Sequence, residues 1–209
     1  METARGPVRD AFVLIGHAHR LPGKFQLPYE GEPILQREIR ILRSAGLRIQ
    51  LVSVVEIVVS GVRTLRDARD AGPLGGLATV LETTDRPFFL FGGDMPLLDP
   101  EGIQHMRRRF RGRPIVPVGA HGAWEVLHAI YAGVNRPQVE QLIAQRGGLK
   151  DLVDEMDRTG QVDWMPLGEI NARSFVDIDT PEAYARLVAP DDSTAGSDRS
   201  AVGGVGTKS

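Results

Sequence analysis

Cysteine is absent from this sequence of 209 residues. Its absence excludes disulfides, thiolate zinc sites, iron–sulfur clusters and a cysteine nucleophile. The chain also has no excess of charge of either sign, because its formal net charge is −2 and its pI is about 6.2. We therefore expect no general attraction to nucleic acid or to an anionic membrane.

Long apolar runs are missing as well. No run approaches the roughly 20 residues that span a bilayer. Residues 1–9 mix charged residues with Gly and Pro and lack the apolar core of a signal peptide. We expect a cytoplasmic protein without a membrane partner, either a monomer or a small homo-oligomer.

The composition changes toward the end of the chain. Residues 190–209 are rich in Ser, Gly, Asp and Ala and contain almost no large apolar side chain. Such a segment buries too little surface to offset its ordering entropy, so we predict a disordered tail. With a similar prediction for residues 1–9, the folded unit is expected to be one domain, residues 10–189.

Within that domain, short apolar runs alternate with segments of helical periodicity. Strands are expected at residues 11–16, 48–54, 87–92, 114–118, 162–167 and 175–178. Helices are expected at residues 33–45, 74–81, 101–110, 138–146, 149–156 and 181–188. This alternation predicts an α/β three-layer sandwich with a mostly parallel, Rossmann-like central sheet. Ligands bind such sheets at the carboxyl ends of the strands, so polar residues that follow strands are the candidate site residues.

The first candidate is the loop Gly16–Lys24, with the sequence GHAHRLPGK, which follows the first strand. Its glycines allow backbone amides to approach a phosphate, while Arg20 and Lys24 could neutralise phosphate charge. The spacing matches neither a Walker loop nor a Rossmann fingerprint, and an ordinary basic loop is the alternative. His17 and His19 could form a metal pair, but no third ligand is near in sequence.

Two later loops carry acidic residues. Asp94 follows two glycines at the end of the most apolar strand, where a carboxylate could hold magnesium over substrate phosphates. Asp177 and Asp179 lie at another strand end and point to the same side of an extended backbone. At least one of them could share the magnesium with Asp94. The alternatives are a turn-forming role for Asp94 and a helix-capping role for the other two.

The order of these segments resembles that of the molybdenum cofactor guanylyltransferases and, more broadly, of nucleotidyltransferases with a glycosyltransferase-A-like sheet. Five pieces match in sequence order, and the resemblance extends over about residues 12–187. They are the first loop followed by GEPIL (16–35), GPLGGL (72–77), GDMPLL (93–98), LHAIY (127–131) and FVDIDTP (175–181).

The resemblance implies a magnesium-dependent nucleotidyltransferase. The catalytic groups would be Arg20, Lys24 and Asp94. The nucleotide would contact the first loop, the turn before the 74–81 helix and an acid beside that turn, namely Gly16, His17, Gly23, Lys24, Asp70, Gly72, Pro73 and Leu74. The metal would bind Asp94 together with Asp177 or Asp179, and residues 127–131 would line the acceptor side.

The chain also departs from the family pattern. Ile15 stands where the family usually has the first of two adjacent glycines, Ala18 replaces a small hydroxyl residue, and the stretch from Arg20 to Lys24 is one residue shorter. Asp177 and Asp179 replace the usual Asn-x-Asn of the guanylyl enzymes and resemble the cytidylyl relatives.

Taken together, the residues and the resemblance predict transfer of a nucleoside monophosphate from a nucleoside triphosphate. GTP is favoured as the donor, and the acceptor would bear a phosphate, as molybdopterin does. The alternatives are a cytidylyl or sugar-phosphate transferase on the same fold and a nucleotide-binding homologue without catalysis.

Overall fold

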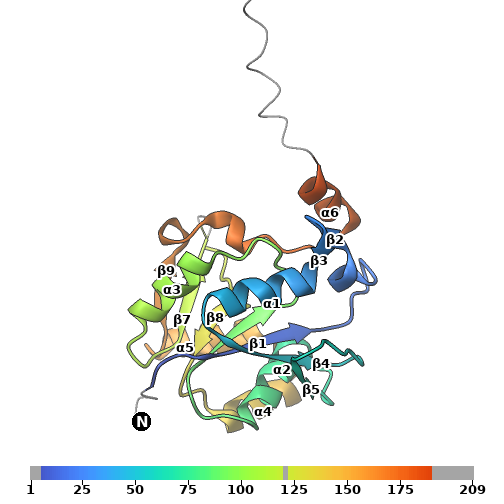
Figure 1. Ribbon diagram of the computed structural model, residues 1–209. Coiled ribbons are helices and arrows are strands. Elements are labelled where there is room, and N and C mark those ends of the chain that lie inside the picture. Colours follow the sequence, from blue (N-terminus) through green and yellow to red (C-terminus); the bar gives the residue numbers. More distant parts are fainter. Residues whose placement is uncertain (1–5, 120–121, 190–209) are drawn as a thin grey trace, which may run out of the picture.

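The computed structural model describes residues 6–119 and 122–189, and the predicted tail, residues 190–209, lies outside this part. A seven-stranded sheet forms the centre, with helices on both faces (Figure 1). The strand order is β5-β4-β1-β6-β8-β7-β9. The predicted α/β three-layer architecture with a mostly parallel sheet is therefore confirmed.

Six of the seven strands run in the same direction. β8 is the exception, because it is antiparallel to both β6 and β7. The strands are β1 (Asp10–Ile15), β4 (Arg48–Ser53), β5 (Arg63–Arg66), β6 (Phe88–Gly92), β7 (Ile115–Val118), β8 (His128–Tyr131) and β9 (Asp163–Pro166). A separate hairpin consists of β2 (Pro28–Tyr29) and β3 (Glu32–Pro33).

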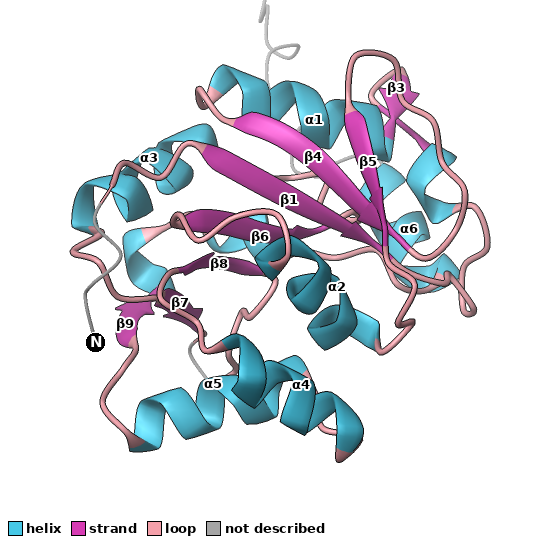
Figure 2. Ribbon diagram, turned by 90° about the horizontal axis from the view of Figure 1, so that it is seen from below, coloured by secondary structure: helices cyan, strands magenta, loops and turns pink. Residues whose placement is uncertain are grey.

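Figure 2 shows the two helical layers. α1 (Ile34–Ser44) and α3 (Pro100–Arg109) cover one face, while α2 (Gly72–Leu81), α4 (Arg136–Ala144) and α5 (Leu149–Arg158) cover the other. α6 (Pro181–Val188) lies beside the β2–β3 hairpin, where the Tyr184 hydroxyl donates to the Pro28 carbonyl at 2.7 Å (Figure 1). Three short 3₁₀ helices complete the fold, η1 (Lys24–Gln26), η2 (Leu167–Glu169) and η3 (Ala172–Phe175). None of the described helices is long and apolar enough to cross a membrane.

The central strands are buried on both faces, as their apolar sequences predict. In β1, Val13 and Ile15 pack in the core beneath α1, whereas Phe12 packs in the core beneath α2. Side chains of β6 alternate between the same two cores. Because successive side chains of a strand point to opposite faces, a continuous apolar run is what a strand between two helical layers requires.

The predicted strand at 175–178 is wrong. η3 ends at Phe175, and the segment after it makes one backbone contact with the site, in which the Ile178 N–H donates to the Asp94 carbonyl at 3.1 Å. The segment is locally apolar, as a strand would be, but a single backbone hydrogen bond to a loop does not form a β-ladder. Conversely, β5 and β8 were not predicted, and in β5 only Leu65 is buried, so that strand has no apolar run.

The folded unit also begins earlier than residue 10. Val8 is only 3% exposed and packs with the α1 core. The Arg9 carbonyl accepts a hydrogen bond from the Arg48 N–H at 2.8 Å, which continues the β1–β4 pairing. The prediction for residues 1–9 is therefore corrected at Val8 and Arg9, since both belong to the folded unit.

Candidate active site

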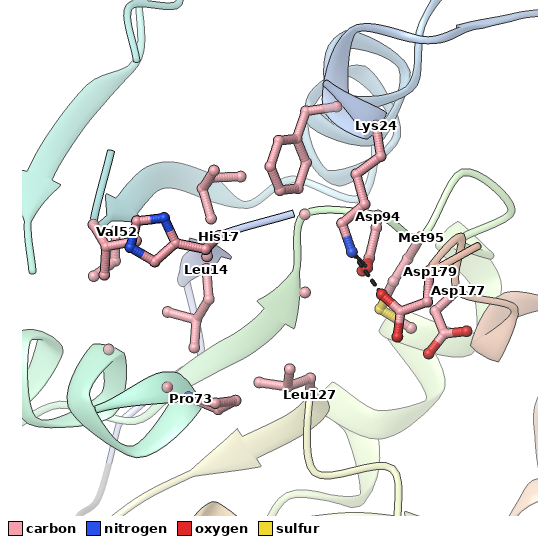
Figure 3. A pocket seen from close by; sticks show the side chains of 18 of the residues that line it. Leu14, His17, Lys24, Val52, Pro73, Asp94, Met95, Leu127, Asp177 and Asp179 are labelled. Atoms are coloured by element: carbon pink, nitrogen blue, oxygen red, sulfur yellow. Dashed lines mark hydrogen bonds and ion pairs between the residues drawn. The ribbon is translucent and has the colours of Figure 1, made fainter. Parts of the chain in front are cut away.

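A cavity of about 430 Å³ lies at the carboxyl ends of β1, β4 and β6. It is lined by residues that follow these strands and by the segment after η3. Those residues include Gly16, His17, Lys24, Asp70, Gly72, Pro73, Asp94, Asp177 and Asp179. The structure therefore gathers most of the predicted site residues around one pocket (Figure 3).

Lys24 is the centre of the charged side of this pocket. Its ammonium group forms ion pairs with the carboxylates of Asp94 and Asp179, and the Nζ to Oδ1 distance to Asp179 is 2.7 Å (Figure 3). Arg20 donates to the other oxygen of Asp179 at 2.9 Å. The side chains of Lys24 and Asp94 are 11% and 16% exposed, so this pair is largely shielded from water.

The protonation states follow from these contacts. Burial lowers the pKa of Lys24, but the adjacent carboxylates outweigh it and the net pKa is raised. The hydrogen bond from Lys24 holds the pKa of Asp179 below its usual value. Burial raises the pKa of Asp94, Lys24 opposes this, and the negative charges of Asp179 and Asp177 add to the increase. At neutral pH Lys24 is therefore an ammonium ion and Asp179 a carboxylate.

Gly93 allows Asp94 to reach the pocket. Its N–H donates to the Leu14 carbonyl at 3.0 Å, which holds the end of β6 against β1. A Cβ atom at Gly93 would lie 2.3 Å from Cδ1 of Ile15 and 3.2 Å from the Leu14 carbonyl oxygen. Only glycine fits this approach without displacement of its neighbours, and the close approach places the next residue at the pocket wall.

The opposite side of the pocket carries the predicted nucleotide contacts. Nε2 of His17 lies 3.2 Å from Oδ2 of Asp70, and the rings of His17 and His19 are 5.3 Å apart. Asp70 has a positive φ of 47° just before α2, whose first residues, Gly72 and Pro73, line the pocket. His17 therefore contacts an acid of the turn before α2.

Three predicted residues do not line the pocket. Leu74 has no exposed surface and packs in the core beneath α2, so its predicted nucleotide contact is wrong. Its helical position turns it toward the sheet, while Pro73 faces the cavity. Gly23 caps η1 with a φ of 72°, and Arg20 contacts the site through Asp179.

The predicted acceptor-side segment is also corrected. His128, Ala129, Ile130 and Tyr131 form β8 and have no exposed surface. An antiparallel strand inside the sheet is covered on both faces, so these side chains cannot contact an acceptor. Leu127, just before the strand, is the one residue of the segment that lines the pocket.

Some lining residues were not predicted. Gly76 lies in α2, where a Cβ atom would be 2.8 Å from Cδ2 of Leu14, so glycine lets the helix approach β1 closely. Val52, Glu125 and Phe175 are further lining residues of this kind. Val52 lies near the end of the predicted strand at 48–54, so the strand-end rule points to its neighbourhood, whereas Glu125 and Phe175 enter the pocket through tertiary packing.

The described residues contain no preassembled cluster of three or more His, Asp or Glu side chains placed to hold a metal. The carboxylates of Asp94 and Asp179 converge on Lys24, and Asp177 lies beside Asp179 (Figure 3). Burial and the Asp179 carboxylate raise the pKa of Asp177. The three side chains supply carboxylate oxygens, which are the ligand type that a hard divalent cation prefers.

Comparison with known proteins places the fold and the sequence in one family. Residues 16–159 match the MobA-like NTP transferase domain. The chain is 33% identical over 150 residues to a probable molybdenum cofactor guanylyltransferase of Pyrococcus furiosus, an alignment that covers 66% of this chain and 74% of the relative.

Solved structures share the architecture at lower identity. The molybdopterin-guanine dinucleotide biosynthesis protein A of Archaeoglobus fulgidus aligns with a TM-score of 0.68 at 19% identity, over 85% of this chain and 96% of that chain. A manganese complex of Rv0371C from Mycobacterium tuberculosis aligns with a TM-score of 0.61 at 18% identity, over 87% of this chain and 98% of that chain. The family match covers more than half of the chain and includes the first loop, Asp70 and Asp94, and the chain therefore belongs to the family of MobA-like NTP transferase domains.

Proposed function

We propose that this chain transfers GMP from GTP to a phosphate-bearing acceptor of the molybdopterin type and releases pyrophosphate. The observation that carries the proposal is the meeting of Lys24 with Asp94 and Asp179 in a pocket at the carboxyl ends of the parallel strands. The choice of GTP and of the acceptor rests on the name of the Pyrococcus furiosus relative.

In the proposed reaction, an oxygen of the acceptor phosphate attacks the α-phosphorus of GTP. The bond from this phosphorus to the oxygen that bridges to the β-phosphate breaks, and pyrophosphate leaves with the bonding electrons. The acceptor phosphate is already ionised, so no general base is required. Lys24 and Arg20 neutralise charge on the phosphates and hold them in place, which is the main protein contribution to such transfers.

Magnesium dependence is part of the proposal. The three carboxylates at the pocket edge, Asp94, Asp177 and Asp179, exceed the charge of the two neighbouring cations, Lys24 and Arg20. Mg²⁺ prefers oxygen ligands and usually needs only one or two protein carboxylates, so Asp94 with Asp177 or Asp179 would hold it. The manganese complex of a structural neighbour is consistent with a divalent cation on this fold. When bound, the cation would supply further charge neutralisation at the phosphates.

A cytidylyl transfer is the second candidate, because Asp177 and Asp179 resemble the end motif of the cytidylyl relatives. The two candidates share the pocket, the cations and the metal. They differ in the nucleotide base that the enzyme accepts. In both cases that base would lie on the side of the pocket formed by His17, Asp70 and Pro73.

Pyrophosphate release tests both candidates. The full chain is incubated with molybdopterin and each of GTP, CTP, ATP and UTP, in MgCl₂ or in excess EDTA. We expect release with GTP and Mg²⁺, loss of release in Asp94→Asn, and normal release in Asp10→Asn. Asp10 is a suitable control because its carboxylate pairs with Arg48 at the opposite end of β1.

Each outcome has a defined meaning. Release with CTP alone would replace the guanylyl reaction with the cytidylyl reaction. Release that persists in EDTA would remove the metal from the proposal. Absence of release with all four nucleotides would contradict the proposed transfer to this acceptor.

A further inference from the structure

A second cavity, of about 840 Å³, adjoins the first. It lies between the β2–β3 hairpin, the segment after η3 and α6. Phe175 and Asp177 line both cavities, so these two residues form a shared wall. A volume of this size is within the ordinary range of roughly 300–1,000 Å³ for small-molecule sites.

Two arginines give this second cavity a cationic lining. Arg173, in η3, and Arg186, in α6, both line it and are exposed. Neither guanidinium lies within 4.0 Å of an acidic oxygen in the described part of the chain, in contrast to Arg37, which pairs with Glu30 at 2.7 Å. That pairing also neutralises Glu30, one of the two acids of the lining. Two unpaired guanidinium groups favour an anionic ligand, since arginine forms bidentate bonds to phosphate.

The same cavity exposes apolar and aromatic surface. Val176 and Val188 are 39% and 46% exposed, and they are two of the three large hydrophobic side chains that the described part of the chain leaves exposed. Tyr29 and Phe175 add aromatic rings to the lining. Apolar surface gathered around a hollow favours a ligand with an apolar or flat ring.

A direct transfer also requires a second binding space. The first cavity contains the acids, the lysine and the turn that suit a nucleoside triphosphate and its metal. The acceptor must bring its phosphate to the α-phosphorus without displacing the donor. A cavity that shares a wall with the first one meets this requirement, and Asp177 marks the point where the two meet.

We propose that the second cavity is the acceptor subsite, which binds a phosphate-bearing compound with a flat heterocyclic ring. Arg173 and Arg186 bind the anionic part of the acceptor, and Tyr29, Phe175, Val176 and Val188 contact its ring. This inference rests on the proposed function, because an acceptor subsite is needed only if the chain transfers a nucleotide. It replaces residues 128–131, which are buried, as the acceptor side.

The test is a kinetic comparison with GTP, Mg²⁺ and molybdopterin. Loss of a charge-assisted hydrogen bond costs roughly 1.5–3 kcal/mol, so Arg173→Ala and Arg186→Ala should each raise the KM for molybdopterin about tenfold or more. The KM for GTP should stay within about twofold in each case. Arg173→Lys and Arg186→Lys should recover part of the loss, because the charge remains but the bidentate geometry does not. Arg108→Ala is the matched control, since Arg108 is exposed on α3 and lies outside this cavity.

A second variant tests the apolar part. Val188→Asp places a negative charge at the cavity mouth and should raise the KM for molybdopterin without lowering the melting temperature, because Val188 is exposed. An unchanged KM for molybdopterin in Arg173→Ala, Arg186→Ala and Val188→Asp would overturn the inference while leaving the proposed function in place.

The wild-type enzyme could also release no pyrophosphate. Equilibrium binding of molybdopterin to the full chain then distinguishes failure of the subsite from failure of the proposed transfer. If the wild type binds it and the arginine variants do not, the subsite stands and the proposed transfer fails. If the wild type does not bind it, both fail.

Discussion

The ammonium group of Lys24 lies 2.7 Å from Oδ1 of Asp179, although 155 residues of sequence separate the two. The same ammonium group pairs with Asp94, so the Lys24 side chain joins three segments that are far apart in the sequence. Arg20 reinforces the contact from the first loop. The edge of the pocket is thus closed by ion pairs between the first loop, the end of β6 and the segment before α6.

Lys24→Ala should lower kcat for pyrophosphate release by about a hundredfold. A fixed positive charge that acts on the transition state contributes on the order of 3 kcal/mol. Steady-state kinetics with saturating GTP measures the loss. Arg48→Ala serves as the control, because Arg48 pairs with Asp10 away from the pocket. A kcat for Lys24→Ala within about twofold of the wild type would exclude Lys24 from the mechanism.

Gly93→Ala should destabilise the fold by roughly 1–3 kcal/mol, since overpacking at a buried position has costs of this size. The added methyl group would meet Ile15 at 2.3 Å and would push Asp94 away from the pocket, so activity should fall as well. Urea unfolding measures the stability.

Two companion variants sharpen that test. Ile15→Val in the Gly93→Ala background should restore part of the stability, because it removes the Cδ1 atom with which the methyl group collides. Gly168→Ala should be near neutral, since its Cβ atom would meet nothing within 4 Å. Wild-type stability of Gly93→Ala would contradict the close packing of β6 against β1.

His128 should make the protein sensitive to acid. It is fully buried between the rings of Phe91 and Phe175, and burial lowers its pKa from 6.5 to about 3. Between these pH values the unfolded chain binds a proton that the folded protein does not. This group therefore lowers the free energy of unfolding by roughly 1.4 kcal/mol for each pH unit below 6.5.

His128→Leu should remove this contribution. Its free energy of unfolding, measured by urea titration between pH 4 and 7, should fall less steeply with acid than that of the wild type. Equal slopes for wild type and His128→Leu would show that His128 does not stay neutral in the folded protein.

Glu38 should give the opposite pH dependence, in which the free energy of unfolding falls as the pH rises. It is fully buried in α1, neither of its carboxyl oxygens has a hydrogen-bond partner, and burial together with the charge of Asp94 raises its pKa well above the usual value. The folded protein then holds a proton that the unfolded chain releases above pH 4.5. Stability contributed by this group is therefore lost as the pH rises from about 4.5 toward the raised pKa.

Glu38→Met should stabilise the protein at neutral pH by about 1–3 kcal/mol, because it removes an unsatisfied buried polar group and keeps a similar length. The gain should shrink as the pH approaches 4.5. Glu56→Met, at an exposed position, should change the free energy of unfolding little. Destabilisation by Glu38→Met at neutral pH would mean that the carboxyl group has a partner in solution.

Much of the fold could be predicted from local patterns. The continuous apolar sequence of β6 and the mixed run of β1 predict strands between two layers, and both are buried on two faces. Asp99 and Pro100 predict the start of α3, and the Asp99 carboxylate accepts from the Glu101 N–H at 3.0 Å. The position of Asp94 directly after a strand predicted its place at the pocket, because strand direction fixes where a strand ends.

The sequence by itself thus determined the α/β class, the central strands, the caps and the family resemblance, since each of these depends on residues within one short window or on their order. Only the tertiary structure decided that Lys24 joins Asp94 to Asp179, that Leu74 and His128 are buried, and that Arg173 and Arg186 line a second cavity. The physical reason is that burial and ion pairing depend on which elements pack together. A separation of 155 residues leaves no local periodicity from which such a contact could be predicted.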